Sequence, residues 1–334
     1  MSEFIRPQIK DLPPPPPGKT GWPWTEASQP IFSTIPNGRS LPKISIVTPS
    51  YNQGEFIEET IRSVLLQGYP NLEYIIMDGG STDGTQEILE RYKPWLSHVV
   101  SEPDSGQSDA IATGFEIASG DILAWLCSDD LYLKGALQWV ANQYSIHPNV
   151  DIISGIANLD QGTGRTFWME LRYRDETPTY LRLIFRGQCV RQPASFWTKE
   201  IYQKTSGVDR SLQFCMDYDL LLKLCQVGKA KYIQQEIAWI RLHKDCKSMN
   251  LKDIHDREKL QIVERALTTI SLPNIFLCTL SYLSLIRYFY RTPTIKPLNK
   301  IGRTIRLFGG YFYHFLHGDV FRWHPIYGFH KISN

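Results

Sequence analysis

The chain has 334 residues, of which 42% are hydrophobic and 21% charged, so it is long enough for two domains and too apolar to be largely disordered. Its formal net charge of +2 argues against a dedicated nucleic-acid-binding protein, and we expect no nucleic-acid partner. The six cysteines include no CxxC pair and no zinc-type Cys/His spacing, and no apolar signal peptide opens the sequence. We therefore expect reduced thiols and a cytoplasmic protein.

Residues 1–42 are expected to be an extension of the folded part. The five consecutive prolines at 13–17 favour polyproline II and forbid helix. The aromatic residues of Gly21–Trp24 can cover a neighbouring surface. Three alternatives remain at this point: a poorly ordered leader, a strap packed on the body, or a ligand for a proline-binding module.

From residue 43 the chain alternates between short apolar runs and amphipathic periods. These patterns predict strands at 43–48, 72–77, 97–102, 121–127 and 151–157, with helices at 55–67, after residue 83, at 107–118 and at 134–146. Strands separated by such helices indicate βαβ units, and hence an α/β fold with a mostly parallel sheet flanked by helices. Ligands of these sheets bind beyond the carboxyl ends of the strands. We expect the loops that start at Pro49, Asp78, Glu102 and Ser128 to lie along that edge.

The pattern is weaker after residue 158. We predict helices at 178–205 and 214–228, a strand at 231–241, and an aromatic, basic α-helical extension from residue 272. The predicted divisions of the chain are thus 1–42, 43–157, 158–271 and 272–334. The longest apolar stretch, at 275–290, contains Arg287 and is shorter than the ~20 residues that a membrane-spanning helix needs.

Asp129 and Asp130 directly follow the apolar run at 122–126. Two adjacent carboxylates repel each other unless a cation or several donors satisfy them. Mg²⁺ or Mn²⁺, shared with substrate phosphates, is the usual solution. The alternative is capping of the helix predicted at 134–146, but one carboxylate suffices for a cap. We therefore expect a metal site.

Two earlier loops carry candidate nucleotide-binding groups. Asp78 and Asp83 flank two glycines that allow a ligand to approach the backbone, so either carboxylate can accept from a base N–H or a ribose hydroxyl. An ordinary turn is the alternative. Tyr51 can stack on a nucleobase, or it can pack as an ordinary aromatic residue.

The remaining candidates lie in three separate segments. Asp104 and Gly106 belong to an acidic loop that leads into a helix, and helix N-termini suit anionic groups. Asp217 opens a strongly apolar helix without a cationic neighbour, which favours a general base; the alternative, an acid that complements the helix dipole, fits Asp219 better. His243, after the strand predicted at 231–241, is by itself most simply a structural histidine.

Taken in order, five segments resemble glycosyltransferase family 2, whose members have the GT-A fold. Residues 46–52 (IVTPSYN), 77–85 (MDGGSTDGT), 101–107 (SEPDSGQ) and 125–132 (WLCSDDLY) resemble the half that binds the nucleotide-sugar. Residues 216–223 (MDYDLLLK), together with Arg241-Leu-His243, resemble the acceptor half. The resemblance implies a GT-A Rossmann-like sheet and an inverting glycosyl transfer.

The resemblance also implies roles for residues of the nucleotide-sugar half. Pro49, Ser50 and Tyr51 would line the nucleobase pocket. Asp78 would accept from the base N3–H, which favours uridine or thymidine, and a UDP-sugar is the favoured donor. Asp104 would lie near the ribose and the sugar.

The implied metal and catalytic residues come from both halves. Asp129 would hold the ribose or the metal, Asp130 would bind the Mg²⁺ or Mn²⁺ that bridges the diphosphate, and His243 would lie close to it. Asp217 would be the general base. Many family members have Asp or Asn where this chain has Cys127, so weaker metal binding is one expectation.

The expected reaction moves a sugar from the nucleotide to a saccharide or lipid-linked hydroxyl, in surface polysaccharide or glycolipid synthesis. A sugar-phosphate nucleotidyltransferase is one alternative, but the loop at 48–54 has no basic residue to grip a triphosphate. A non-catalytic nucleotide-sugar-binding protein is another. A nicotinamide dehydrogenase is excluded because no GxGxxG follows the first strand.

The end of the chain bears on the acceptor. Between residues 287 and 334 lie eight Lys or Arg residues, a single acid, and 12 aromatic residues. This mixture suits a surface that lies on anionic lipid, so an anionic membrane is one expected partner and the inner face of the membrane one expected location. The alternative is an aromatic helical subdomain that closes the acceptor cleft.

Overall fold

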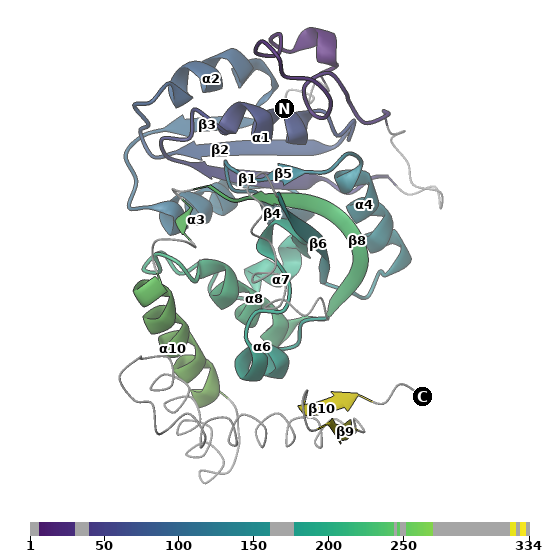
Figure 1. Ribbon diagram of the computed structural model, residues 1–334, viewed down its shortest axis with the longest axis vertical. Coiled ribbons are helices and arrows are strands. Elements are labelled where there is room, and N and C mark those ends of the chain that lie inside the picture. Colours follow the sequence, from purple (N-terminus) through teal and green to yellow (C-terminus); the bar gives the residue numbers. More distant parts are fainter. Residues whose placement is uncertain are drawn as a thin grey trace. The chain divides into compact units, whose positions relative to one another are not determined.

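A computed structural model of the chain describes residues 7–30, 40–160, 177–243, 246–247, 252–269, 321–324 and 328–331. The chain divides into two compact units, one of residues 1–180 and 188–250 and the other of residues 181–187 and 251–334. All the candidate site residues belong to the first unit, which is built around one sheet (Figure 1). The second unit contains most of α6 (Tyr180–Arg186), α10 (Lys252–Thr268) and the antiparallel pair β9 (Phe321–His324) and β10 (Gly328–Lys331).

The sheet of the first unit has eight strands in the order β3-β2-β1-β4-β7-β6-β8-β5. They are β1 (Ile44–Ser50), β2 (Leu72–Asp78), β3 (His98–Ser101), β4 (Ile122–Trp125), β5 (Leu131–Tyr132), β6 (Ile152–Asp160), β7 (Ser195–Thr198) and β8 (Ala230–Arg241). The helices of this unit are α1 (Ile57–Leu65), α2 (Thr85–Tyr92), α3 (Gln107–Ile117), α4 (Ala136–Ile146), α7 (Lys199–Gln203) and α8 (Met216–Val227). The predicted α/β class, a sheet flanked by helices, is confirmed.

Helices cover both faces of the sheet around β1. Ile44 and Ile46 belong to the same hydrophobic core as Ile57 of α1. On the opposite face α3 lies so close that a Cβ added at its Gly114 would collide with Val47. All seven residues of β1 are buried, and a strand that is covered on both faces has a nearly continuous apolar sequence instead of an alternating one. This explains the short apolar run that predicts the strand.

The strands β3-β2-β1-β4 form a parallel half of the sheet. Ser50, Asp78 and Ser101, the last residues of β1, β2 and β3, pair in register and form one row. β4 runs in the same direction and leads to the loop that contains Asp129 and Asp130. The predicted loops therefore do follow the carboxyl edge of parallel strands.

The rest of the sheet is mixed, with β7 antiparallel to both β4 and β6. The predicted helix over 178–205 is wrong, because α6 ends at Arg186 and a 3₁₀ turn (Gln192–Ala194), β7 and α7 follow. Gly187 adopts a left-handed φ of 84°, and Pro193 has no backbone N–H for a helical hydrogen bond. β7 fills the gap between β4 and β6, a long-range pairing that no local pattern indicates.

β8 is long and strongly curved (Figure 1). It runs parallel to β6 with an irregular register around Gly155, where an added Cβ would lie 2.8 Å from the carbonyl oxygen of Gln235. Its last part also pairs with β5, placing Leu131 opposite Trp239. Because β5 follows Asp130 immediately, this pairing brings the end of β8 to the acidic loop.

Residues 7–30 form a strap on the body of the first unit, which was one of the three alternatives for the N-terminal extension. The guanidinium of Arg62, fully buried in α1, donates to three strap carbonyls, those of Pro13 at 2.9 Å, Pro23 at 3.1 Å and Trp24 at 2.8 Å. It also donates to the Tyr92 hydroxyl at 2.9 Å. A buried cation thus holds the strap through neutral acceptors.

No helix in the described part of the chain is long and apolar enough to cross a bilayer. The helices predicted from residue 272 fall outside the described residues as far as 320, and the described residues 321–324 and 328–331 are strands instead. As expected for reduced thiols, the five cysteines within the described ranges form no disulfide.

Candidate functional site

The acidic pair Asp129–Asp130 lies in the short loop between β4 and β5, beyond the carboxyl end of β4. The Thr60 hydroxyl of α1 lies 2.8 Å from the carbonyl oxygens of both Ser128 and Asp130, where it donates its hydrogen. A backbone hydrogen bond from Asp130 N to the carbonyl of Cys127, at 3.0 Å, closes the turn. These hydrogen bonds, one set from α1 and one within the loop, fix the backbone positions of Asp129 and Asp130.

The helix-capping alternative for this pair is wrong. The helix that follows, α4, begins at Ala136 and is preceded by Gly135, with a left-handed φ of 82° and no side-chain cap. β5 separates the acids from this helix. The pair is therefore available for a ligand instead of a helix end.

His243 lies beside the acidic pair, as the resemblance implies. Its Nε2 is 3.0 Å from Oδ2 of Asp129, and its ring packs on Phe56 with the ring centroids 4.4 Å apart. The backbone N–H of Arg241 donates to Oδ1 of Asp130 at 3.2 Å. The end of β8 thus contacts both carboxylates, one through a side chain and the other through the backbone.

The environment of Asp130 disfavours its ionised form while Asp129 is charged. Burial, and then the charge of Asp129, raise the pKa of Asp130 well above its usual range, although the Arg241 N–H and guanidinium oppose the shift. Burial and the charges of Asp130 and Asp129 also raise the pKa of the Cys127 thiol, and Asp217 contributes in the same direction. Such a group of like charges is stabilised by a proton or a cation.

The donor atoms here fit a divalent cation. Ligand atoms of Cys127, Asp129 and Asp130 lie within 4.8 Å of one another, and so do those of Asp129, His243 and Cys246. Carboxylates suit Mg²⁺ and Mn²⁺, whereas imidazole and thiolate suit softer ions. Asp129 belongs to both groups and is therefore the common ligand.

Asp78 is buried at the end of β2 and organises the turn that follows. Its carboxylate accepts from the Ser81 N–H at 3.0 Å, from the Ser81 hydroxyl at 2.5 Å and from the Ser101 hydroxyl at 2.7 Å. Ser50, its neighbour in register, has a buried hydroxyl without a hydrogen-bond partner in the described part of the chain. An unsatisfied polar group next to Asp78 fits a site that a polar ligand completes.

Asp83 connects the loops after β1 and β2. One carboxylate oxygen accepts from Gly54 N at 2.9 Å, and the other from the Thr85 hydroxyl at 2.6 Å. Burial alone would raise the pKa of Asp83, but these hydrogen bonds lower it. In the loop that Asp83 anchors, Tyr51 is 63% exposed, so the alternative of an ordinary packed aromatic residue is wrong. Pro49 and Ser50, the last two residues of β1, are buried.

The acidic loop after β3 folds back over the turn after β2. A Cβ added at Gly79 would lie 3.0 Å from Oδ2 of Asp104, so the carboxylate lies directly on this glycine. The amide of Gly106, at the start of α3, donates to Oδ1 of Asp104 at 2.8 Å. The Gly106 N–H that we expected near an anionic ligand group is thus satisfied by a carboxylate of the protein.

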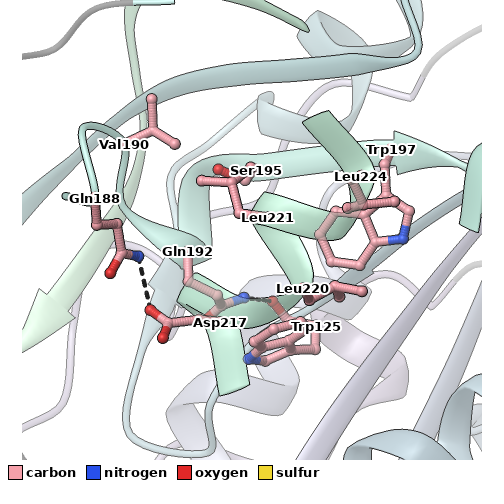
Figure 2. Close-up of a pocket in the computed structure, with 10 residues that line it drawn as sticks. All are labelled: Trp125, Gln188, Val190, Gln192, Ser195, Trp197, Asp217, Leu220, Leu221 and Leu224. Atoms are coloured by element: carbon pink, nitrogen blue, oxygen red, sulfur yellow. Dashed lines mark hydrogen bonds between the residues drawn. The ribbon is translucent and has the colours of Figure 1, made fainter. Parts of the chain in front are cut away.

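Asp217 lies in the first turn of α8 and lines a pocket with side chains of β4, β7 and α8 (Figure 2). Gln188 donates from Nε2 to Oδ2 of Asp217 at 2.7 Å, and Gln192 donates to the Trp125 carbonyl at 2.6 Å. The other members of the lining are Val190, Ser195, Trp197, Leu220, Leu221 and Leu224. The candidate base therefore lies at the polar end of a largely apolar pocket.

Asp219, two residues further on, has the structural role that its position predicts. It is buried and forms an ion pair with Lys223 at 2.7 Å, one turn along α8. Sequence reasoning missed Cys246, although its position three residues after His243 is a readable spacing for two ligands. It also missed Gln188 and Phe56, because a lone glutamine or phenylalanine carries no spacing signal. Their proximity depends on how β8 and α8 pack against the parallel half.

Comparison with known proteins consistently finds similarity to glycosyltransferases. The family model for glycosyl transferase family 2 matches residues 45–204. An uncharacterised glycosyltransferase of Mycobacterium tuberculosis is 30% identical over 56% of this chain and 71% of that protein. A putative teichuronic acid biosynthesis glycosyltransferase of Bacillus subtilis, TuaG, is 44% identical over 29% of this chain and 40% of that protein.

Among solved structures, residues 1–349 of Staphylococcus aureus TarS in complex with UDP-GlcNAc match with a TM-score of 0.58. The two are 15% identical, and the match covers 87% of this chain and 99% of that one. Because the two sequences are only 15% identical, the similarity is evidence for the fold alone. It confirms the GT-A-like arrangement of the sheet.

Proposed function

The chain belongs to glycosyl transferase family 2 and is a glycosyltransferase, and from this premise we propose that it moves a sugar from a UDP-sugar to a hydroxyl acceptor by single displacement, with inversion and with Asp217 as general base. The observation that carries the proposal is the meeting of two elements at one edge of the sheet. The end of β8 brings His243 to 3.0 Å from Asp129, beside the buried Asp130. Family membership favours this reaction over a nucleotidyltransferase and over a non-catalytic binding protein.

The donor would lie along the carboxyl ends of β1 to β4. Pro49, Ser50 and Tyr51 would line the base, with the exposed ring of Tyr51 available for stacking. Asp78 would accept from the base N3–H, because a carboxylate only accepts hydrogen bonds; this favours uridine. The structurally similar TarS has been solved in complex with UDP-GlcNAc, which is consistent with a UDP-sugar donor here.

The remaining polar groups would hold the ribose and the diphosphate. Asp104, above Gly79, would lie near the ribose and the sugar, while Asp83 positions the loop that carries Tyr51. Asp129 and Asp130, with His243, would hold Mg²⁺ or Mn²⁺. When bound, that cation neutralises charge on the departing diphosphate.

Asp217 would take the acceptor proton. Its carboxylate is oriented by Gln188, so the base is prepositioned for the acceptor hydroxyl. With the diphosphate on one side of the anomeric carbon and the base on the other, one displacement inverts the configuration. Proton nuclear magnetic resonance of the product reads this configuration directly, and retention would exclude the single displacement.

The test of the base is Asp217→Asn, which keeps the shape and removes the basicity. We expect the turnover number to fall by roughly 10²- to 10⁴-fold, the usual contribution of a general base, while the affinity for UDP measured by calorimetry stays unchanged. Asp109→Asn, which removes a surface ion pair with Arg210, is the control and should keep full activity. Asp217→Asn with near-normal turnover would exclude Asp217 as the base.

We propose surface polysaccharide or glycolipid as the product, since TuaG is named for teichuronic acid biosynthesis. The acceptor would be a saccharide or a lipid-linked sugar, and the eight basic residues at 287–334 favour attachment to the inner, anionic face of a membrane. Flotation with anionic vesicles, comparing the natural chain with a Lys296→Glu, Lys300→Glu, Arg303→Glu variant, tests this. Equal recovery of both chains away from the vesicles would contradict it.

A further inference from the structure

The end of β8 places a cysteine beside the candidate cation site. Ligand atoms of Asp129, His243 and Cys246 lie within 4.8 Å of one another, and Cys246 is buried. A carboxylate oxygen, an imidazole nitrogen and a sulfur are together a donor set for zinc-like ions, because Mg²⁺ selects oxygen alone. The ligand atoms of Asp129, His243 and Cys246 therefore favour a softer ion than the Mg²⁺ or Mn²⁺ that Asp129 and Asp130 favour.

The local backbone prepares the sulfur of Cys246 for a metal. The His243 N–H donates to Sγ of Cys246 at 3.2 Å, and a hydrogen bond of this kind stabilises a thiolate. The thiol itself donates to the Arg241 carbonyl at 3.4 Å, a long and weak interaction that is lost at little cost. The backbone N–H of Cys246 also donates to the His243 carbonyl at 3.2 Å, so the nitrogen and sulfur donors are close together before any ion arrives.

His243 also carries a polar atom that the protein leaves unsatisfied. Nε2 faces Asp129 at 3.0 Å, whereas Nδ1 is buried without a hydrogen-bond partner in the described part of the chain. Packing on Phe56 restricts the ring. An imidazole held in this way loses little freedom when one nitrogen binds an ion, and preorganisation of this kind strengthens binding.

We propose that Asp129, His243 and Cys246 form a three-ligand site for a borderline transition ion of the Zn²⁺ or Co²⁺ kind, with the Cys246 sulfur as a ligand. Three protein ligands leave the fourth tetrahedral position open, where a phosphate oxygen or water binds. On binding, the S–H bond of Cys246 breaks, the proton goes to the buffer, and the sulfur pair forms the bond to the ion. No oxidation or reduction takes place.

The proposal rests on the proposed function only through Asp129 and His243, which that function also assigns to the Mg²⁺ or Mn²⁺ site. An ion at Asp129–His243–Cys246 would take this carboxylate away from a hard ion at Asp129–Asp130. Zn²⁺ should therefore inhibit transfer in the presence of Mg²⁺, whereas binding itself needs neither a nucleotide nor turnover. The two proposals can thus fail independently.

Cobalt is the probe, because thiolate ligation gives Co²⁺ a near-ultraviolet charge-transfer band. The full-length chain is titrated with Co²⁺ in the absence of nucleotide, and Zn²⁺ is then added. We expect this band together with the intense visible absorption of tetrahedral Co²⁺, release of one proton per ion, and loss of both absorptions on adding Zn²⁺. Weak octahedral absorption without the charge-transfer band would overturn the proposal.

Two cysteine variants identify the sulfur. Cys246→Ser should abolish the charge-transfer band and weaken Co²⁺ binding by at least about tenfold. Cys127→Ser is the matched control, since Cys127 also lies within 4.8 Å of Asp129 but belongs to the group without an imidazole, and it should keep the band. Loss of the band in Cys127→Ser, with retention in Cys246→Ser, would overturn the assignment.

Separate control experiments show that the effects on Co²⁺ binding come neither from misfolding nor from loss of catalysis. Thermal unfolding without metal shows whether Cys246→Ser is folded, and His243→Gln offers a second ligand variant that should weaken Co²⁺ binding likewise. Asp217→Asn should keep the cobalt spectrum unchanged. If the spectrum forms as expected but no UDP-sugar is turned over, the proposed function fails while the metal site stands.

Discussion

Gln188 donates a 2.7 Å hydrogen bond from Nε2 to Oδ2 of Asp217, across 29 positions of the chain. The bond holds one oxygen of the carboxylate that we propose as the base (Figure 2). A base must be positioned within a fraction of an ångström to act on a bound hydroxyl. Gln188 is therefore a positioning residue.

Gln188→Leu should lower the turnover number by about 10- to 100-fold, the cost of misplacing a reacting group. The KM for the UDP-sugar should stay unchanged, because Gln188 contacts the base and not the donor site. Steady-state kinetics separate the two constants. Gln192→Leu is the control, since it lines the same pocket but donates to the Trp125 carbonyl; equal losses of turnover in both variants would contradict the positioning role.

Asp130→Asn should weaken the binding of Mn²⁺ by more than the roughly 10- to 100-fold that loss of an outer-sphere partner costs. The amide keeps an acceptor for the Arg241 N–H but removes the charge that attracts the ion. Electron paramagnetic resonance of unbound Mn²⁺ measures the effect. Asp121→Asn, at the amino end of β4, where its carboxylate accepts from Lys43 N, should bind Mn²⁺ normally.

Arg62→Met should destabilise the protein by about 3–5 kcal/mol, because each buried acceptor that loses its donor costs about 1–3 kcal/mol. The variant leaves the buried carbonyls of Pro23 and Trp24 and the half-buried carbonyl of Pro13 without their donor. Urea unfolding measures the change. Arg91→Met removes a half-exposed ion pair with Glu58 and should cost under about 1 kcal/mol, so similar losses in the two variants would argue against the strap as a stabilising element.

Glu73 lies on β2, far along the strand from its carboxyl end, and accepts from Lys43 Nζ, the Ser45 hydroxyl and the Ser119 backbone and hydroxyl. Burial alone would raise the pKa of Glu73, but these donors lower it from 4.5 to about 2. The ionised carboxylate therefore stabilises the native state above the unfolded pKa of 4.5, and this contribution is lost as the pH falls towards 2.

The corresponding variant is Glu73→Gln, which should lower the free energy of unfolding by roughly 3 kcal/mol at neutral pH. The difference from the natural chain should shrink as the pH is lowered from 5 towards 2. Urea unfolding across this range gives the curve. Glu200→Gln, which removes an exposed pair with Lys204, should leave the urea midpoint unchanged, and a Glu73→Gln deficit that is independent of pH would contradict the ionic origin.

Local sequence patterns were sufficient to predict the strands of the parallel half of the sheet. The runs at 43–48 and 72–77 became β1 and β2 because both strands are covered on two faces and so need consecutive apolar residues. Since parallel strands end at one edge, the acidic loops of Asp78 and Asp129 could be placed together from the sequence. Asp219 could likewise be separated from Asp217 by its position in the helix.

Only the tertiary structure decided which distant groups meet. The insertion of β7 between β4 and β6, the pairing of β8 with β5, and the hydrogen bond from Gln188 to Asp217 join segments tens of residues apart. Periodicity reports which face of an element is buried, not which partner buries it. The same limit applies to Cys246 beside Asp129 and to Arg62 beneath the strap, whose roles follow from packing between segments.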